Sequence, residues 1–405
     1  MTAAGKETVP DLTAWRVFLT FIRLGLIGFG GPAAHLGLFR ETLVRRAGWV
    51  SERVYDELLA LCQFLPGPGS SQTAAALGWV KAGPVGAIAA LTGFALPSVM
   101  IMGLAGYGAA AHADLIPDGV RTGLLAAAAA VVGAAVVSMA QSQARRPAAA
   151  GLAVFGFAAT LAGAATALPL AAVQPCVIAL GAALGAALLR GAHRGGHAEP
   201  APRKGRPRGA WIALGLVLAG LLILPVSAGE ARVAALADAV FRSGALVFGG
   251  GHVVLPLLES GTVPEFVDRE TFLAGYGLAQ SIPGPVFTFA AFLGAAAGDG
   301  PAGAAVFAVV AVLAIFTPGL LLVFAVLPAW ARLKQNAAAA GALAGAAAAV
   351  TGILAAAFIN PVLTSLPADW TAYALAAAGF AALRLLNASP PLVVAACAGA
   401  GWLAL

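Results

Sequence analysis

Two arginines stand in apolar sequence, each shortly before a glycine-rich run. Arg23 precedes GFGGP at 28–32, and Arg242 precedes VFGGG at 247–251. A cation at the centre of a bilayer costs about 2.5–3.5 kcal/mol, so function is the default explanation for such a residue. A guanidinium suits an anion because it donates paired hydrogen bonds to oxyanion oxygens. Two structural alternatives stay open: an arginine whose head group reaches the membrane interface, and, for Arg242, an ion pair with Asp238 one helical turn earlier.

Four runs of glycine and proline interrupt apolar segments, at 30–32, 66–68, 249–251 and 283–285. Irregular backbone at membrane depth is tolerated only where protein or a wet cavity covers it. A helix that restarts there presents free N–H groups and about half a positive charge, which favours an anion. The expected binding residues are Arg23, Gly30, Gly31, Gln63, Gly67, Arg242, Gly249, Gly250, Gln280 and Gly284, and the residues that break the helices are Pro32, Pro66, Pro68, Pro283 and Pro285.

Polar side chains near the breaks suggest two further roles. Gln63 and Gln280 occupy equivalent places and are candidates to donate amide hydrogens to an oxyanion, with plain interhelical hydrogen bonding as the alternative. His35 and His252 have ordinary pKa values near neutrality, so they are candidates to carry a proton, as is Asp238. For a histidine near a helix end, an ordinary hydrogen bond is the alternative.

The rest of the chain predicts an all-helical integral membrane protein. Of its 405 residues, 60% are hydrophobic and 10% are charged. Apolar stretches of helix-spanning length recur, and their lack of strand alternation favours helices over a barrel. The acids are scattered and Cys62, Cys176 and Cys397 lie far apart, so we expect no enzyme activity, no metal and no cofactor.

Positive charge gathers in one stretch. Six of the 23 Lys and Arg residues lie between Arg190 and Arg208, among glycines and prolines. This composition is typical of a linker, and its charge predicts a cytoplasmic position for 191–209. The stretch lacks the aromatic interleaving of a nucleic-acid site, so we expect no nucleic-acid partner.

The motifs recur at a nearly constant spacing. RLGLIGFGGP at 23–32 aligns with RSGALVFGGG at 242–251 at an offset of 219, and QFLPGP at 63–68 aligns with QSIPGP at 280–285 at an offset of 217. Several matches in the same order indicate a duplicated unit. We expect a first repeat at 1–190, a linker with one connecting helix at 191–230, and a second repeat at 231–405.

Loop charges predict that the two repeats are inverted. The loop from Phe39 to Glu57 carries Arg40, Arg45, Arg46 and Arg53, whereas its counterpart at 259–270 has only Arg269. Because Lys and Arg favour the cytoplasmic side, the first loop is expected inside and the second outside. Broken or re-entrant helices of the two repeats would then meet near the midplane. Whether 15–38 and 232–258 re-enter or span the membrane stays open.

The signatures RxGxxxFGGP…QxxPGP and RxGxxxFGGG…QxxPGP resemble the two-domain chromate ion transporters of the CHR family. The resemblance is clearest at 18–104 and 241–322, and Gly251 departs from it where the first half has Pro32. It implies antiparallel halves in the inner membrane of a prokaryote. It also implies a proton-linked exporter of chromate, a tetrahedral dianion like sulfate, that confers chromate resistance. Some members are single halves that act as a pair, so a homodimer is kept open.

Physical reasoning fits the implied activity without deciding it. With the cell interior negative, expelling a dianion is favoured by about 4.6 kcal/mol per 100 mV. The expected partners are an oxyanion and the lipid bilayer. A sulfate or other oxyanion transporter or exchanger, an anion channel and a membrane enzyme acting on lipid-linked phosphates remain as alternatives.

Overall fold

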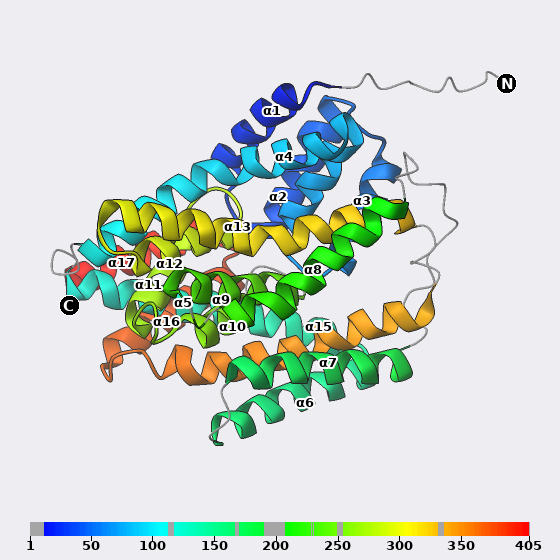
Figure 1. The fold of residues 1–405 in the computed structure, drawn as a ribbon. Helices are drawn as coiled ribbons and strands as arrows, with labels where there is room; N and C mark the ends of the chain where they lie inside the picture. Colours follow the sequence, from blue (N-terminus) through cyan, green and yellow to red (C-terminus); the bar gives the residue numbers. More distant parts are fainter. Residues whose placement is uncertain are drawn as a thin grey trace.

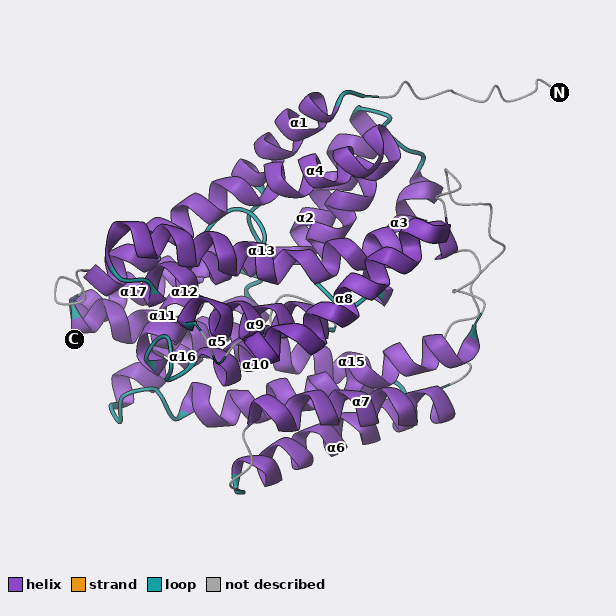
Figure 2. Ribbon diagram, in the orientation of Figure 1, coloured by secondary structure: helices purple, strands orange, loops and turns teal. Residues whose placement is uncertain are grey.

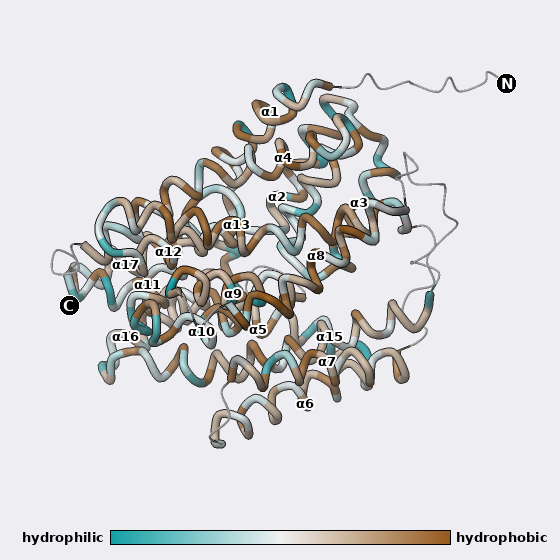
Figure 3. Tube along the Cα trace, viewed as in Figure 1, coloured by the Kyte–Doolittle hydropathy of each residue, from teal (hydrophilic) through white to brown (hydrophobic). Residues whose placement is uncertain are grey.

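The computed structural model describes residues 12–111, 117–166, 170–189, 207–227, 229, 231–248, 254–330 and 336–404. All regular elements in these ranges are helices (Figure 2). The helices long and apolar enough to cross a membrane lie in α4 (Gly69–Ala111), α5 (Asp118–Ala144), α6 (Pro147–Ala164), α8 (Pro207–Ser227), α13 (Gly300–Val326) and α15 with its extension (Ala337–Leu363). Figure 3 shows hydrophobic colouring along most of α8 and α13. The expectation of an all-helical membrane protein is confirmed.

The order of helices in the first half recurs in the second. Each half begins with two pairs of short helices and continues with long ones. The first half contains α1 (Ala14–Ile27), α2 (Gly31–Phe39), α3 (Glu52–Phe64), α4, α5, α6 and α7 (Leu170–Leu188). The second half contains α9 (Arg232–Leu246), α10 (Val254–Thr262), α11 (Arg269–Ala279), α12 (Phe289–Ala297), α13, α15, α16 (Trp370–Leu385) and α17 (Pro390–Ala404).

The single helix α4 corresponds to the pair α12 and α13. Its backbone leaves the helical conformation at Ala82 and Gly83, and Gly78 packs against Gly86, so 69–81 and 84–111 are two helices that fold back on each other. Gly83 has φ +68°, and Gly300, at the start of α13, has φ +64°. Both glycines precede a proline, which is favourable in the first turn of a helix. α8 lies between the two halves in sequence and packs against α9 and α13.

The halves exchange long helices. α5 of the first half packs against α16 and α17, and α15 of the second half packs against α6 and α7. Figure 1 shows α15 beside α7. Glycines allow the close approach, because an added Cβ on Gly123 would clash with Cys397 of α17 and one on Gly345 would clash with Gly181 of α7. Each half is therefore completed by a helix from the other.

The short helices of each half begin and end at the same end of the molecule. Leu12, before α1, donates its amide to Lys81 O (3.1 Å), and Lys81 Nζ lies 6.0 Å from the Trp49 ring. At 1.5 Å per residue, the 14 residues of α1 span about 21 Å, less than the bilayer core of about 30 Å. The segment 15–38 therefore turns back to the end of the molecule at which it begins.

The second half shows the same arrangement. Arg232, which opens α9, lies 5.8 Å from the Phe266 ring and 4.0 Å from Asp299, which follows α12. Phe266 is the counterpart of Trp49 at the offset of 217. The start of α9, the connection from α10 to α11 and the end of α12 thus lie together.

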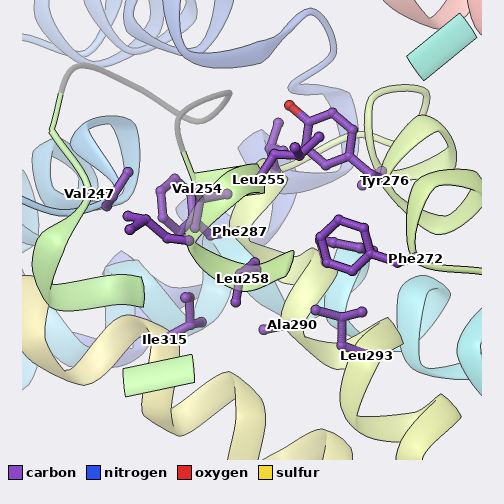
Figure 4. Packing of buried hydrophobic residues seen from close by; sticks show 14 of the residues in the cluster. Val247, Val254, Leu255, Leu258, Phe272, Tyr276, Phe287, Ala290, Leu293 and Ile315 are labelled. Atoms are coloured by element: carbon purple, nitrogen blue, oxygen red, sulfur yellow. The ribbon is translucent and has the colours of Figure 1, made fainter. Parts of the chain in front are cut away.

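The largest buried apolar cluster surrounds the short helices of the second half. Figure 4 shows Val247, Val254 and Phe287 close together, with Ile315 of α13 nearby. Val247 belongs to the glycine-rich break and Phe287 follows the Pro-Gly-Pro run. Apolar packing therefore covers the start of the glycine-rich run and the residues that follow the Pro-Gly-Pro run, which is the condition for irregular backbone at membrane depth.

We expect Gly345→Val to destabilise the fold, because the new side chain must separate α15 from α7. Overpacking of this kind costs about 1–3 kcal/mol. Thermal unfolding of the purified protein in detergent measures the effect. Gly215→Val is the matched control, since Gly215 is also helical but nothing lies within 4 Å of its Cβ position. Equal melting temperatures for the two variants would contradict the proposed role of the close approach.

Candidate functional site

Two backbone hydrogen bonds join the breaks of one half to those of the other. The amide of Gly67 donates to Val247 O at 2.8 Å, and the amide of Gly284 donates to Gly28 O at 2.8 Å. Gly67 and Gly284 lie in the Pro-Gly-Pro runs, whereas Val247 and Gly28 open the glycine-rich runs. The two bonds are equivalent under the sequence offsets of 217 and 219. Each Pro-Gly-Pro run thus meets the first residue of the other half's glycine-rich run.

Glycine is required at the donor of each bond. Gly67 has φ +127° and Gly284 has φ +104°, conformations that a residue with a side chain rarely adopts. An added Cβ on Gly284 would lie 2.5 Å from Ser98 Oγ, and one on Gly67 would lie 3.2 Å from Gly319 Cα. Ser98 follows Pro97 of α4, and Gly319 follows Pro318 of α13. Each Pro-Gly-Pro run therefore packs against the proline-containing stretch of the other half's long helix.

Polar atoms without partners face this region from the first half. Gln72 Nε2 donates to Pro66 O (2.8 Å) and to Gly319 O (3.2 Å), so the side chain bridges the halves. Gln72 Oε1 and Ser71 Oγ are buried without a hydrogen-bond partner among the described residues. Both residues lie in the first turn of α4, where free amides and the helix dipole favour an anion. Sequence reasoning did not name Gln72, although its place just after the 66–68 break was a usable signal.

The expected glutamine pair is not equivalent in the structure. Gln280 is 5% exposed, and its Nε2 is buried without a partner in the described part of the chain. Gln63, near the end of α3, is exposed. An unpaired buried amide is a donor available to an oxyanion, because leaving it unsatisfied costs about 1–3 kcal/mol. The placement supports hydrogen bonding to an oxyanion more strongly for Gln280 than for Gln63.

His35 makes ordinary hydrogen bonds. Its Nε2 lies 2.8 Å from Gly28 O, which also accepts the Gly284 amide, and its Nδ1 lies 3.4 Å from Ser70 Oγ. The ring also packs edge-on against Phe94 at 5.1 Å. A ring nitrogen that faces a carbonyl must carry a proton, so His35 holds the acceptor of a cross-half bond in place.

The structure describes some of the other expected residues of the glycine-rich runs. Gly30 (φ +95°) and Gly31 (φ +75°) form the turn into α2, with Pro32 in its first turn. Gly249, Gly250 and His252 lie outside the described residues.

The two arginines have different surroundings. Arg242 forms a two-point ion pair with Asp238, with 2.9 Å between Nε and Oδ1 and a second contact from Nη2 to Oδ2. The sequence left open an ion pair between Arg242 and Asp238, one helical turn earlier, and the structure shows this pair. Arg23 is exposed on α1 and makes no ion pair or hydrogen bond with any described side chain. It shares a face with Trp15 and Leu19, both exposed, so it lies on the outer surface of the protein and not in its interior.

A pocket of ≈ 410 Å³ lies beside the Arg242–Asp238 pair. Its lining includes Gln174 of α7, Ser260 of α10 and Glu265. Arg23 is not part of that lining, and no hydrogen bond or ion pair in the described structure joins the two arginines. Among the described residues, no group of three or more His, Cys, Asp or Glu could hold a metal ion.

Comparison with known proteins decides the family. The sequence pattern of the family "Chromate transporter" matches residues 15–186 and 234–402. The chain belongs to the chromate transporter family. The two matched parts contain all four breaks and both cross-half hydrogen bonds, and the sequence between them holds the basic linker and α8.

Individual relatives cover nearly the whole chain. The chain is 29% identical to the "Chromate transport protein" of Cupriavidus metallidurans, over 100% of this chain and 96% of that protein. It is 27% identical to the "Chromate transport protein" of Pseudomonas aeruginosa, over 99% and 95%. It is 28% identical to the "Probable chromate transport protein" of Synechococcus elongatus, over 84% and 82%. No solved structure matches the chain. The resemblance drawn from the break motifs is confirmed.

We expect Gly284→Ala to weaken the cross-half contact, because the new Cβ meets both a strained φ and Ser98 Oγ. Gly300→Ala is the control, since Gly300 also has a positive φ but open space at its Cβ position. A residue held in such a backbone region costs about 1–3 kcal/mol, so both variants should lose stability and Gly284→Ala should lose more. Ser98→Gly in the Gly284→Ala background should recover part of the difference. Thermal unfolding in detergent tests the order, and no recovery in the double variant would show that Ser98 is not the obstacle.

Proposed function

We propose that this protein is a secondary transporter that exports chromate across the cytoplasmic membrane and confers chromate resistance. The single observation that carries the site is the pair of equivalent hydrogen bonds that joins each Pro-Gly-Pro run to the start of the other half's glycine-rich run. Broken helices at the interface of two repeats are the usual place for a substrate in such transporters. The choice of chromate draws on the printed names of the relatives from Cupriavidus and Pseudomonas. The activity is transport and not catalysis.

The anion site is proposed at the first turns of the restarting helices. Ser71 Oγ and Gln280 Nε2 are donors without partners, and the start of α4 adds free amides. Arg23 and Arg242 are proposed to attract the dianion toward the breaks, since each precedes a glycine-rich run in sequence. Arg242 must share its guanidinium between the anion and Asp238, because the ion pair occupies two of its donors.

Inversion of the two repeats is part of the proposal. Figure 1 places α3 toward one end of the molecule and α11 toward the other, together with α16 and α17. The loop before α3 is rich in arginine and the loop before α11 is not, which supports a cytoplasmic first loop and an external second loop. The same reasoning supports a cytoplasmic linker at 191–209, and the recurring order of helices supports repeats bounded at 1–190 and 231–405.

A sulfate transporter is the second candidate, because sulfate is also a tetrahedral dianion and would use the same donors. The observation that favours it is the neutral character of the unpaired groups, Ser71 and Gln280, which recognise an oxyanion by hydrogen bonds without distinguishing its central atom.

We expect inverted membrane vesicles that contain the protein to take up radiolabelled chromate at a fixed membrane potential. Arg23→Ala and Arg242→Ala should lower the rate by about 10- to 100-fold if each removes a charged hydrogen bond to the anion. Arg16→Ala is the matched control, since Arg16 is an exposed arginine on the same helix. Sulfate uptake, measured with and without a pH gradient, separates the two candidates. Uptake of neither anion would refute the proposed function, and normal uptake by both correctly inserted variants would refute the role of the arginines.

Labelling with an impermeant thiol reagent tests inversion separately. Arg45→Cys and Glu265→Cys place thiols in the two equivalent loops, where both native side chains are exposed. Cys176→Ala removes the exposed native thiol, and Cys62 and Cys397 are buried. We expect position 45 to react only from the cytoplasmic side and position 265 only from outside. Reaction of both positions from the same side would overturn the inversion.

A further inference from the structure

A second ion pair joins the end of α10 to the start of α11. Glu259 lies near the end of α10 and Arg269 opens α11, with 3.3 Å between Arg269 Nε and Glu259 Oε1. The Glu259 side chain is 8% exposed, whereas that of Arg269 is 51% exposed. Glu259 Oε1 has no hydrogen bond of regular geometry in the described structure, so the contact with Arg269 is its main compensation. A buried carboxylate with one ionic partner is poorly compensated, because burial of a charge costs several kcal/mol unless hydrogen bonds complete the pair.

The first half contains the same ion pair with its charges exchanged. Arg40 corresponds to Glu259 at the offset of 219, and Glu52 corresponds to Arg269 at the offset of 217. Arg40 Nε lies 3.4 Å from Glu52 Oε2, and the two side chains are 35% and 48% exposed. The duplicated unit thus keeps the pairing and reverses its polarity. The carboxylate is buried only in the second-half pair.

The buried pair lines a pocket of its own. This pocket of ≈ 410 Å³ is lined by Glu259 and Arg269 together with Thr160, Gln174 and Asn360. Its wall toward the pocket beside Arg242 contains Ser260, whose Oγ donates to Gln174 Oε1 at 3.1 Å. The pocket therefore combines one cation, one carboxylate and neutral polar groups, and it has room for a small ion with its water.

Few charged groups face Glu259 from the helices that pack against α10. α7 and α15 with its extension carry no charged residue, and they contribute Gln174 and Asn360. The charged groups of α9, α11 and the intervening loop have other partners or line the adjoining pocket. Asp238 pairs with Arg242, Arg232 with Asp299 at 4.0 Å, and Glu270 with Arg121 at 3.4 Å. Asp268 caps α11 through Thr271, and Glu265 lines the neighbouring pocket. Arg269 is accordingly the one charged side chain that shares this pocket with Glu259 among the described residues.

We propose that this pocket is a proton-linked oxyanion site, in which the Glu259 carboxylate and a tetrahedral oxyanion compete for the Arg269 guanidinium. When Glu259 takes up a proton it becomes neutral, and Arg269 is free to bind the anion. When Glu259 releases the proton, its carboxylate regains Arg269 and the anion leaves. Each cycle takes up one proton together with one anion and releases both, so the site links anion binding to pH. The class of anion rests on the proposed function.

The carboxyl group is suited to this exchange near neutral pH. Glu259 lies at the loop end of a short helix, outside the membrane-spanning segments. Burial raises the pKa of its carboxyl to about 7, although the charge of Arg269 beside it lowers the pKa. A raised pKa means that the proton is bound below neutrality and lost above it. Anion binding should therefore be tight in acid and weak in alkali.

Binding of radiolabelled sulfate to the purified full chain tests the site, because sulfate keeps its charge over this pH range. For the native protein, we expect one class of binding to weaken between pH 7 and pH 8 by up to about ten-fold. Glu259→Gln should bind with the same affinity at pH 6 and pH 8, because an amide cannot release the proton. Arg269→Gln should lose this class of binding at both pH values. Glu52→Gln is the matched control at the equivalent exposed pair and should keep the native pH profile.

Two outcomes overturn the proposal: a native pH profile in Glu259→Gln, or native binding in Arg269→Gln. Arg269→Gln leaves Glu259 buried without its cation, so the double variant Glu259→Gln/Arg269→Gln is measured as well, and it must also lose this class of binding. Absence of any pH-dependent binding in the native protein overturns the proposal too. Chromate uptake by vesicles containing Glu259→Gln separates this result from the proposed function, because uptake with an unchanged pH profile refutes the proton-linked site and leaves transport standing.

Discussion

Peptide groups at a helix break need partners, and bilayer hydrocarbon offers none. This constraint explains the most symmetric feature of the molecule. The amides of Gly67 and Gly284 each donate to a carbonyl of the other half, and the glycines that donate have the positive φ that the geometry demands. Neither half can satisfy these groups by itself. The exchange of α5 and α15 between the halves has the same effect on a larger scale, because it gives each half a long helix to pack against. The breaks and the exchanged helices together make the two halves one structure.

The backbone keeps the symmetry, whereas the side chains do not. His35 supports the carbonyl of Gly28, but its counterpart at the offset of 219 is Val254, a buried apolar residue. Arg242 pairs with Asp238, whereas Arg23 has Leu19 at the equivalent position and stays exposed. These differences follow from what each bond needs: a backbone hydrogen bond constrains φ and space but not the neighbouring side chains. Two copies of one unit are therefore free to acquire different chemistry around the same framework.

Local pattern predicted the framework well, because its causes are local. Gly-Pro runs, helix-length apolar stretches and the repeat at 217 to 219 residues located the breaks, the helices and their recurrence before any contact was known. The i, i+4 spacing also predicted an Asp238–Arg242 ion pair as the alternative to anion binding. The partner of each break was beyond reach, since it depends on how the halves pack. The solvent exposure of Arg23 and Gln63 could not be predicted, for the same reason. These residues share motifs with Arg242 and Gln280, but only the fold decides which helix faces are covered. The Glu259–Arg269 pair was accessible in principle, because the offsets that align the breaks also align it with Arg40 and Glu52.

The reversed order of acid and base in the two ion pairs bears on the direction of transport. A duplicated pair with the same polarity in both copies would respond alike to protons at both ends of the molecule. Here the acid of the first pair, Glu52, is about half exposed, so water screens its interaction with Arg40. The acid of the second pair, Glu259, is buried with one ionic partner, so its charge depends on pH near neutrality. If the repeats are inverted as proposed, the buried acid faces one compartment and the exposed acid faces the other. The asymmetry that a directional, proton-linked transporter requires then arises from burying one carboxylate, with no change in the backbone framework that the halves share.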